Sequence, residues 1–123
     1  MKQKDKELLL KDLTARMLYG VCVHIIYKEG EPCYGKLTPR DIQWFIDSKI
    51  ENIKPYLRPM SSMTEEEKND YLNTFKKSII GTDEEDGRVW TVDSIDWLNA
   101  HHFDYRGLIE KGLALEAPEK MYK

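Results

Sequence analysis

The segment that most constrains this chain is residues 21–27, Val-Cys-Val-His-Ile-Ile-Tyr, which is rich in β-branched residues and predicts a strand. Because side chains alternate between the faces of a strand, one face carries Val21, Val23, Ile25 and Tyr27, and the other carries Cys22, His24 and Ile26. Both faces are largely apolar. Such a strand is expected to be covered on both sides, within a small barrel or by a helix laid against the sheet.

Residues 28–32 predict a turn, and residues 33–38 predict the returning strand of a hairpin. Cys22 and Cys33 are the two cysteines of the chain. In this hairpin they do not lie opposite each other, and a disulfide needs Cα atoms within about 7 Å. We therefore expect two reduced, mostly buried thiols, in agreement with a cytoplasmic protein.

Residues 5–18 predict a short amphipathic helix that packs on the sheet. Its apolar stripe consists of Leu9, Leu13 and Met17, widened by Leu10 and Leu18. The charged residues of the helix are expected to lie off the centre of this stripe, namely Lys6, Lys11, Asp12 and Arg16.

Residues 38–54 fit two structures. Alternating Ile42, Trp44 and Ile46, followed by a turn, indicate two further short strands. Thr38, followed by a proline and an acidic residue, instead indicates the start of a helix with an apolar stripe. We favour strands because a lone hairpin needs partners to complete a sheet, so the sheet is expected to span residues 20–54.

Residues 55–63 contain Pro55 and Pro59 and are expected to form an extended connector that continues neither element. A helix over residues 64–78 should follow, with Thr64 and Glu67 as the two partners of a capping box. The side chains that this helix is expected to bury are Tyr71, Leu72, Phe75 and Ile79.

Residues 88–115 predict a short strand and then a helix–turn–helix corner, in which a helix at 94–101 is followed by a second short helix after Tyr105. Residues 116–123 are expected to be a tail. Residues 1–123 together predict a single α+β domain. It combines an N-terminal helix, a small antiparallel sheet with an SH3-like barrel as one form, and C-terminal helices packed on the sheet.

His101 and His102 lie beside Asp104, and such groups can bind zinc or catalyse proton transfer. Adjacent histidines, however, point about 100° apart on a helix and in opposite directions on a strand. We therefore expect a structural pair, with one ring packed on Trp97 and the other hydrogen-bonded to Asp104 or to the backbone. The acidic segment 82–87 does not match the spacing of a calcium-binding EF-hand loop. We predict neither a metal nor another cofactor.

The formal net charge is −3, so the chain as a whole lacks the basic character of a sequence-independent DNA-binding protein. A local basic strip does occur within residues 36–60, formed by Lys36, Arg40, Lys49, Lys54 and Arg58. The N-terminal apolar run is shorter than the roughly 7–15 residues of a signal peptide or the ~20 of a membrane span. We expect a cytoplasmic protein that does not bind membranes.

Two segments, Ile-Lys-Pro-Tyr-Leu-Arg-Pro-Met-Ser-Ser-Met-Thr-Glu-Glu-Glu at 53–67 and the block at 96–118 that begins Asp-Trp-Leu-Asn-Ala-His-His-Phe-Asp-Tyr-Arg-Gly, carry a resemblance. They resemble a family of small uncharacterised proteins of gut Bacteroides-type bacteria, often found near prophages or mobile elements. The resemblance implies a bacterial cytoplasmic protein with a phage-associated context. It implies no catalytic residues.

The leading hypothesis is a non-enzymatic interaction or accessory protein that binds an unidentified protein partner or associates with itself. Its expected binding surface consists of His101, His102, Asp104, Arg106, Tyr56 and Arg58. The alternative is a nucleic-acid-binding accessory protein that uses the basic strip, with Trp44 and Tyr56 for base stacking. A third hypothesis is a metal-dependent enzyme at His101, His102 and Asp104.

Overall fold

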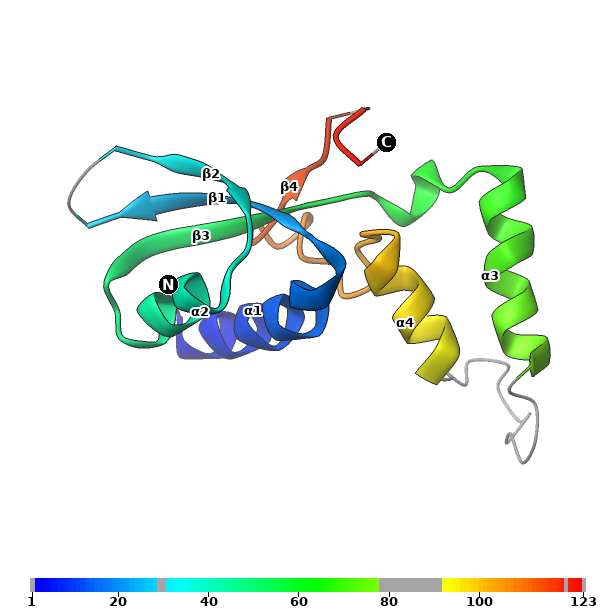
Figure 1. Ribbon diagram of the computed structural model, residues 1–123, viewed down its shortest axis with the longest axis horizontal. Helices are drawn as coiled ribbons and strands as arrows, with labels where there is room; N and C mark the ends of the chain where they lie inside the picture. Colours follow the sequence, from blue (N-terminus) through cyan, green and yellow to red (C-terminus); the bar gives the residue numbers. More distant parts are fainter. Residues whose placement is uncertain (1, 29–30, 78–91, 119, 123) are drawn as a thin grey trace.

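The computed structural model describes residues 2–28, 31–77, 92–118 and 120–122, and of residues 75–77, 92 and 93 it describes only the backbone. The predicted acidic loop 82–87 and the short strand expected from residue 88 lie outside the described residues, as does the predicted burial of Phe75 and Ile79. The described elements combine helices with a four-stranded sheet (Figure 1), which confirms the α+β class.

Helix α1 (Gln3–Arg16) continues into a single 3₁₀ turn, η1 (Met17–Tyr19). The predicted apolar stripe is confirmed at its centre, because Leu9 and Leu13 are fully buried. Leu18, which was expected to widen the stripe, is instead 89% exposed. The tighter turn after Arg16 changes the helical phase and directs Leu18 away from the core.

The sheet has the strand order β2-β1-β3-β4, so β2 and β4 form its two edges. Its first three strands are antiparallel neighbours, and the short β4 runs parallel to β3. A closed SH3-like barrel is not confirmed. The strands are β1 (Cys22–Tyr27), β2 (Cys33–Lys36), β3 (Ile50–Leu57) and β4 (Leu115–Glu116).

Residues 39–46 form a helix, α2 (Pro39–Ile46), so the favoured prediction of strands was wrong here and the helical alternative holds. The local sequence explains the outcome. The Thr38 hydroxyl accepts a hydrogen bond from the Asp41 N–H at 3.3 Å, and the Asp41 carboxylate accepts one from the Thr38 N–H at 3.0 Å. This capping box, with a proline at the first helical position, outweighs the alternating pattern.

Strand β3 passes through Pro55, although the connector 55–63 was expected to continue neither element. The Tyr56 carbonyl is directed toward β1, and the Leu57 carbonyl accepts a hydrogen bond from Ala117 beyond β4 at 2.8 Å. Because these groups alternate along a strand, the missing N–H of Pro55 faces the β4 side. β4 pairs only with Tyr56 and Leu57, so the proline removes no hydrogen bond from the sheet.

After β3, a 3₁₀ turn η2 (Met60–Ser62) leads into helix α3 (Glu65–Lys77), which stands beside α4 at one end of the molecule (Figure 1). The predicted capping box is confirmed by hydrogen bonds of 3.0 and 3.1 Å between Thr64 and Glu67. The predicted burial of Leu72 was wrong, because this side chain is 55% exposed.

Helix α4 (Val92–Ala100) is followed by turns, where a second short helix was expected. The segment 116–123, predicted to be a tail, is partly built into the fold. β4 begins at Leu115, and Tyr122 reaches back into the sheet, where its hydroxyl bonds the backbone of both β1 and β3.

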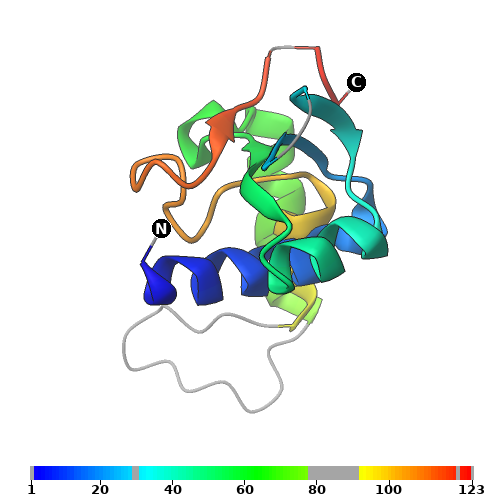
Figure 2. The ribbon, with the colours of Figure 1, turned by 90° about the vertical axis from the view of Figure 1, so that its left-hand side faces the viewer.

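Helices α1 and α2 cover one face of the sheet, and no described helix lies on the opposite face (Figures 1 and 2). The apolar core lies between the covered face and these helices. The expectation that both faces of β1 are covered was therefore wrong, since Cys22, His24 and Ile26 remain half-buried. The core residues include Leu9, Leu13, Val21, Val23, Ile25, Leu37, Ile42, Phe45, Ile50, Ile53, Leu57 and Leu108.

Two leucines at the end of the first helix provide a test of this packing. Leu13→Ala should lower the free energy of unfolding by about 2–5 kcal/mol, because it removes a fully buried side chain. Leu18→Ala is the matched control and should change it by less than about 0.5 kcal/mol. Chemical denaturation measures both values, and equal losses would contradict the packing of α1.

Candidate functional site

The predicted histidine pair lies where α4 ends. The backbone of His102 is left-handed, with φ of 64°. Its N–H bonds the carbonyl of Asn99 at 3.1 Å, and the N–H of Phe103 bonds the carbonyl of Leu98 at 2.9 Å. These two bonds form a Schellman motif with histidine at the position that glycine usually takes. The adjacent His101 and His102 are consequently directed to different neighbours.

His101 and His102 both form ring stacks. The ring of His101 stacks on Trp97 with centroids 3.9 Å apart, and its Nδ1 donates to the Trp97 carbonyl at 2.9 Å. The ring of His102 stacks on Tyr122 at 3.7 Å. The expected contact with Trp97 is thus present. The hydrogen bond expected to Asp104 or to the backbone is made to the backbone, and by the same ring, that of His101.

His102 is buried, and its Nδ1 has no hydrogen-bond partner among the described residues. Burial, followed by electrostatic interactions with Arg16, His101 and Arg58, lowers the pKa of His102 from 6.5 to about 4. The imidazole is therefore neutral near pH 7. Residues 101–106, which follow α4, are called the corner below. A buried, neutral ring that stacks on Tyr122 is suited to holding this corner in place.

Asp104 is also buried, and its carboxylate binds the backbone that follows it. Its two oxygens accept hydrogen bonds from the N–H groups of Leu108 at 2.8 Å and Ile109 at 3.0 Å. The backbone of Asp104 further donates to the carbonyl of Arg58 at 2.8 Å. Asp104 thus closes the turn that replaces the predicted second helix.

Arg106 belongs to an ion cluster that the sequence patterns did not predict. The carboxylate of Asp12 accepts from Nε of Arg16 at 2.9 Å and from Nη1 of Arg106 at 2.7 Å. Both guanidinium groups lie over the ring of Tyr105, at 5.2 and 4.7 Å from its centroid. Asp12 and Arg16, which were expected to lie off the centre of the apolar stripe, are fully buried.

Arg58 is likewise engaged within the protein. Its guanidinium donates to both carboxylate oxygens of Glu67, at 2.8 and 2.7 Å, and lies 4.2 Å from the centroid of the Phe103 ring. The hydrogen bonds from Arg58 are the main reason why the pKa of Glu67 is lowered to about 2. The pair connects the start of α3 to the corner.

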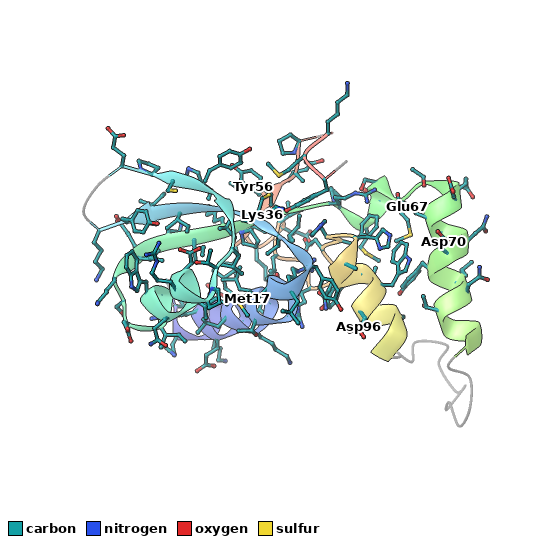
Figure 3. The ribbon with its side chains drawn as sticks, in the orientation of Figure 1. Met17, Lys36, Tyr56, Glu67, Asp70 and Asp96 are labelled. Atoms are coloured by element: carbon teal, nitrogen blue, oxygen red, sulfur yellow. The ribbon has the colours of Figure 1, made fainter. Side chains whose placement is uncertain are left out.

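Five of the six residues predicted to form a binding surface therefore make contacts within the protein. They are buried, stacked or paired, namely His101, His102, Asp104, Arg106 and Arg58. The sixth, Tyr56, lies elsewhere. Figure 3 places Tyr56 and Lys36 close together over the sheet, away from Glu67.

Tyr56 belongs to a surface that we call the open sheet face, formed by His24, Tyr34, Lys36, Lys54 and Tyr56. Register places three of these residues in one cross-strand row, because His24 pairs with Tyr34 of β2 and with Lys54 of β3. The rings of Tyr34 and Tyr56 meet edge to face at 6.0 Å. Tyr34 is 63% exposed, which is unusual for a large aromatic side chain.

The hydroxyl of Tyr122 holds one end of this face. It accepts from the Cys22 N–H at 3.0 Å and donates to the Tyr56 carbonyl at 2.5 Å, so it bridges β1 and β3 where they separate. Both cysteines are free thiols, as predicted. Their predicted burial was wrong, because Cys22 is half-buried and Cys33 is exposed.

The fold divides the predicted basic strip. Lys36 and Lys54 lie on the open sheet face, whereas Arg58 is paired with Glu67. Arg40 stacks on Trp44, 5.1 Å from its centroid. Trp44 and Lys49 line a separate hollow of about 360 Å³, together with Tyr27, Lys28 and Ser48.

His24 and Tyr34 were not predicted as part of any binding surface. The information lay in the hairpin register, which places them opposite each other. The length of the turn decides that register, and the composition of residues 28–32 does not fix it to within one residue.

No protein-family model, curated protein or solved structure matches the chain. Among the described residues, no group of three or more histidine, cysteine, aspartate or glutamate side chains is arranged to hold a metal ion. None of the described helices has the length and apolar character needed to cross a bilayer.

The buried His102 predicts a pH dependence of stability. The unfolded chain takes up the proton near pH 6.5 and the folded chain only near pH 4, so the unfolded state binds more protons between these values. The free energy of unfolding should therefore be highest above pH 6.5 and should decrease as the pH is lowered toward 4. The loss attributable to this group is up to about 3 kcal/mol.

His102→Asn removes the titrating group and keeps a residue that tolerates the left-handed backbone. Urea unfolding of both proteins between pH 7 and pH 4.5, above the window in which Glu67 takes up its proton, measures the difference. A variant that retains the full pH slope of the wild type would contradict the role of His102.

The ion cluster gives a second prediction. Asp12→Ala leaves two guanidinium groups without their carboxylate and should lower the free energy of unfolding by about 3–5 kcal/mol. Glu7→Ala, on an exposed site of the same helix, should cost less than about 0.5 kcal/mol. Denaturant titration compares the two, and a loss at Asp12 no larger than at Glu7 would show that the cluster is not formed.

Proposed function

We propose that this chain is a non-enzymatic interaction protein that binds a macromolecular partner through its open sheet face. The single observation that carries the proposal is the aromatic pair of the exposed Tyr34 and the half-buried Tyr56, which lies on a lysine-bearing sheet face that no described helix covers. Exposed aromatic side chains are costly in water and are concentrated at recognition surfaces.

The distribution of polar groups also supports binding. The charged groups of the corner 101–106 pair with Asp12 and the backbone, and Arg58 pairs with Glu67, so these groups are directed inward. The side chains of the open sheet face are directed outward, with Tyr34 on the edge strand β2. A sheet face that stays accessible, while the charged side chains of the corner are paired within the protein, is typical of a docking site.

Photo-crosslinking tests the proposal. A benzoylphenylalanine in place of Tyr34 should capture a macromolecule in a lysate of the organism that encodes the chain. The same group in place of Leu18, which is 89% exposed beyond α1, is the matched control. Gel electrophoresis compares the products, and equal products at both positions, or none at position 34, would contradict a binding role for this face.

The bacterial and prophage-associated context implied by the family resemblance remains a prediction. It bears on where the partner is found, and not on the surface that binds it.

A further inference from the structure

The two tyrosine rings of the open sheet face provide surfaces on which planar groups can stack. Their ring planes are inclined at 84°, with centroids 6.0 Å apart. One flat ligand cannot stack on both rings at this angle, so each ring is expected to take a separate planar group. Nucleobases are planar, and stacking on tyrosine tolerates every base because each has a π-face.

The lysines of this face lie beside the rings. Lys36 pairs in register with Cys22, and Lys54 pairs with His24, which itself pairs with Tyr34. Neither lysine forms a salt bridge with a carboxylate of the described residues, unlike Arg58 and Arg106. These two cross-strand rows carry positive charge and no carboxylate, although the whole chain has a net charge of −3 and Lys54 also lines a hollow with Asp5 and Glu51.

We propose that the open sheet face binds single-stranded nucleic acid, with bases stacked on Tyr34 and Tyr56 and phosphates beside Lys36 and Lys54. This inference rests on the proposed function, because it names the partner of the same surface. Single strands are required because the bases of a duplex already stack on each other and cannot reach the rings.

Charge complementarity favours a nucleic acid over a protein partner. The centres of protein–protein interfaces are enriched in tyrosine but depleted of lysine. Here Lys54 lies in the same cross-strand row as Tyr34, and Lys36 lies two residues from Tyr34 along β2, which suits a partner with a regular array of negative charge. Aromatic side chains next to cations are the combination that binds single strands without sequence preference.

Fluorescence anisotropy with a labelled single-stranded oligonucleotide of about ten nucleotides tests the inference directly. Binding is expected at about 50 mM salt, weaker binding at about 200 mM, and weaker binding still to a duplex of the same sequence. A lack of binding at low salt, or duplex binding as tight as single-strand binding, would overturn the inference.

Matched variants separate stacking from charge. Tyr34→Ala should weaken binding about tenfold or more, whereas Tyr34→Phe should keep the affinity within about twofold, because the ring remains. Lys36→Gln and Lys54→Gln should each reduce the slope of log K against log salt by about 0.7. Lys11→Gln, on an exposed site of α1, changes the net charge equally and should leave the slope unchanged. If Lys11→Gln reduced the slope as much, or Tyr34→Ala bound like wild type, the assignment to this face would fail.

The crosslinked product at position 34 distinguishes this inference from the broader proposal. A product that nuclease shortens supports both. A product that nuclease leaves unchanged would keep the binding role of the face and overturn the nucleic-acid inference. Absence of any product would overturn the binding role itself.

Discussion

The arrangement of this fold depends on the buried carboxylate of Asp12. It binds the guanidinium group of Arg16 one helical turn away and that of Arg106, which lies 94 positions later in the chain. Arg16 also donates to the carbonyl of Phe103 at 2.6 Å. The first helix and the corner that follows α4 are thereby joined through charged groups, where an apolar contact would be the usual solution. Since a lone buried charge is very unfavourable, these groups have to meet when the chain folds.

Such a cluster need not add much net stability. Removing two arginines and an aspartate from water costs several kcal/mol per ion, and replacing a buried ion pair by apolar residues is often neutral or stabilising. In addition, Nη1 of Arg16 has no partner among the described residues, which costs roughly 1–3 kcal/mol. The main effect of the cluster is therefore to fix the position of the corner. A guanidinium group hydrogen-bonds to a carboxylate in only a few geometries, so the corner is expected to have one orientation relative to α1 and the sheet.

The features that the sequence predicts well are those set by neighbours along the chain. The capping box of Thr64 and Glu67 follows from the spacing of these two residues alone. The features it predicts poorly depend on distant partners. Hydropathy placed Asp12 and Arg16 off the centre of the apolar stripe and did not indicate their full burial, because charged residues are rarely buried, and nothing near them in the sequence indicates Arg106. Likewise, the sequence identifies the two lysines and Tyr56 of the open sheet face as candidate binding residues. Tyr34 joins them only through the register of the hairpin, which the sequence does not fix. The end of α4 was predictable only to within a residue, since a histidine there takes a conformation usually taken by glycine.

The corner and the open sheet face are connected by one continuous series of contacts. Arg16 holds the backbone at Phe103, His102 stacks on Tyr122, and the hydroxyl of Tyr122 joins β1 to β3 at Tyr56. If the corner moved, Tyr122 would leave an N–H and a carbonyl of the sheet without partners, and both lie where water has limited access. The strands would then be free to separate further beside Tyr56, which would displace one of the two rings on the face. The corner 101–106 would therefore act indirectly on the proposed binding, because it holds in place one end of the open sheet face.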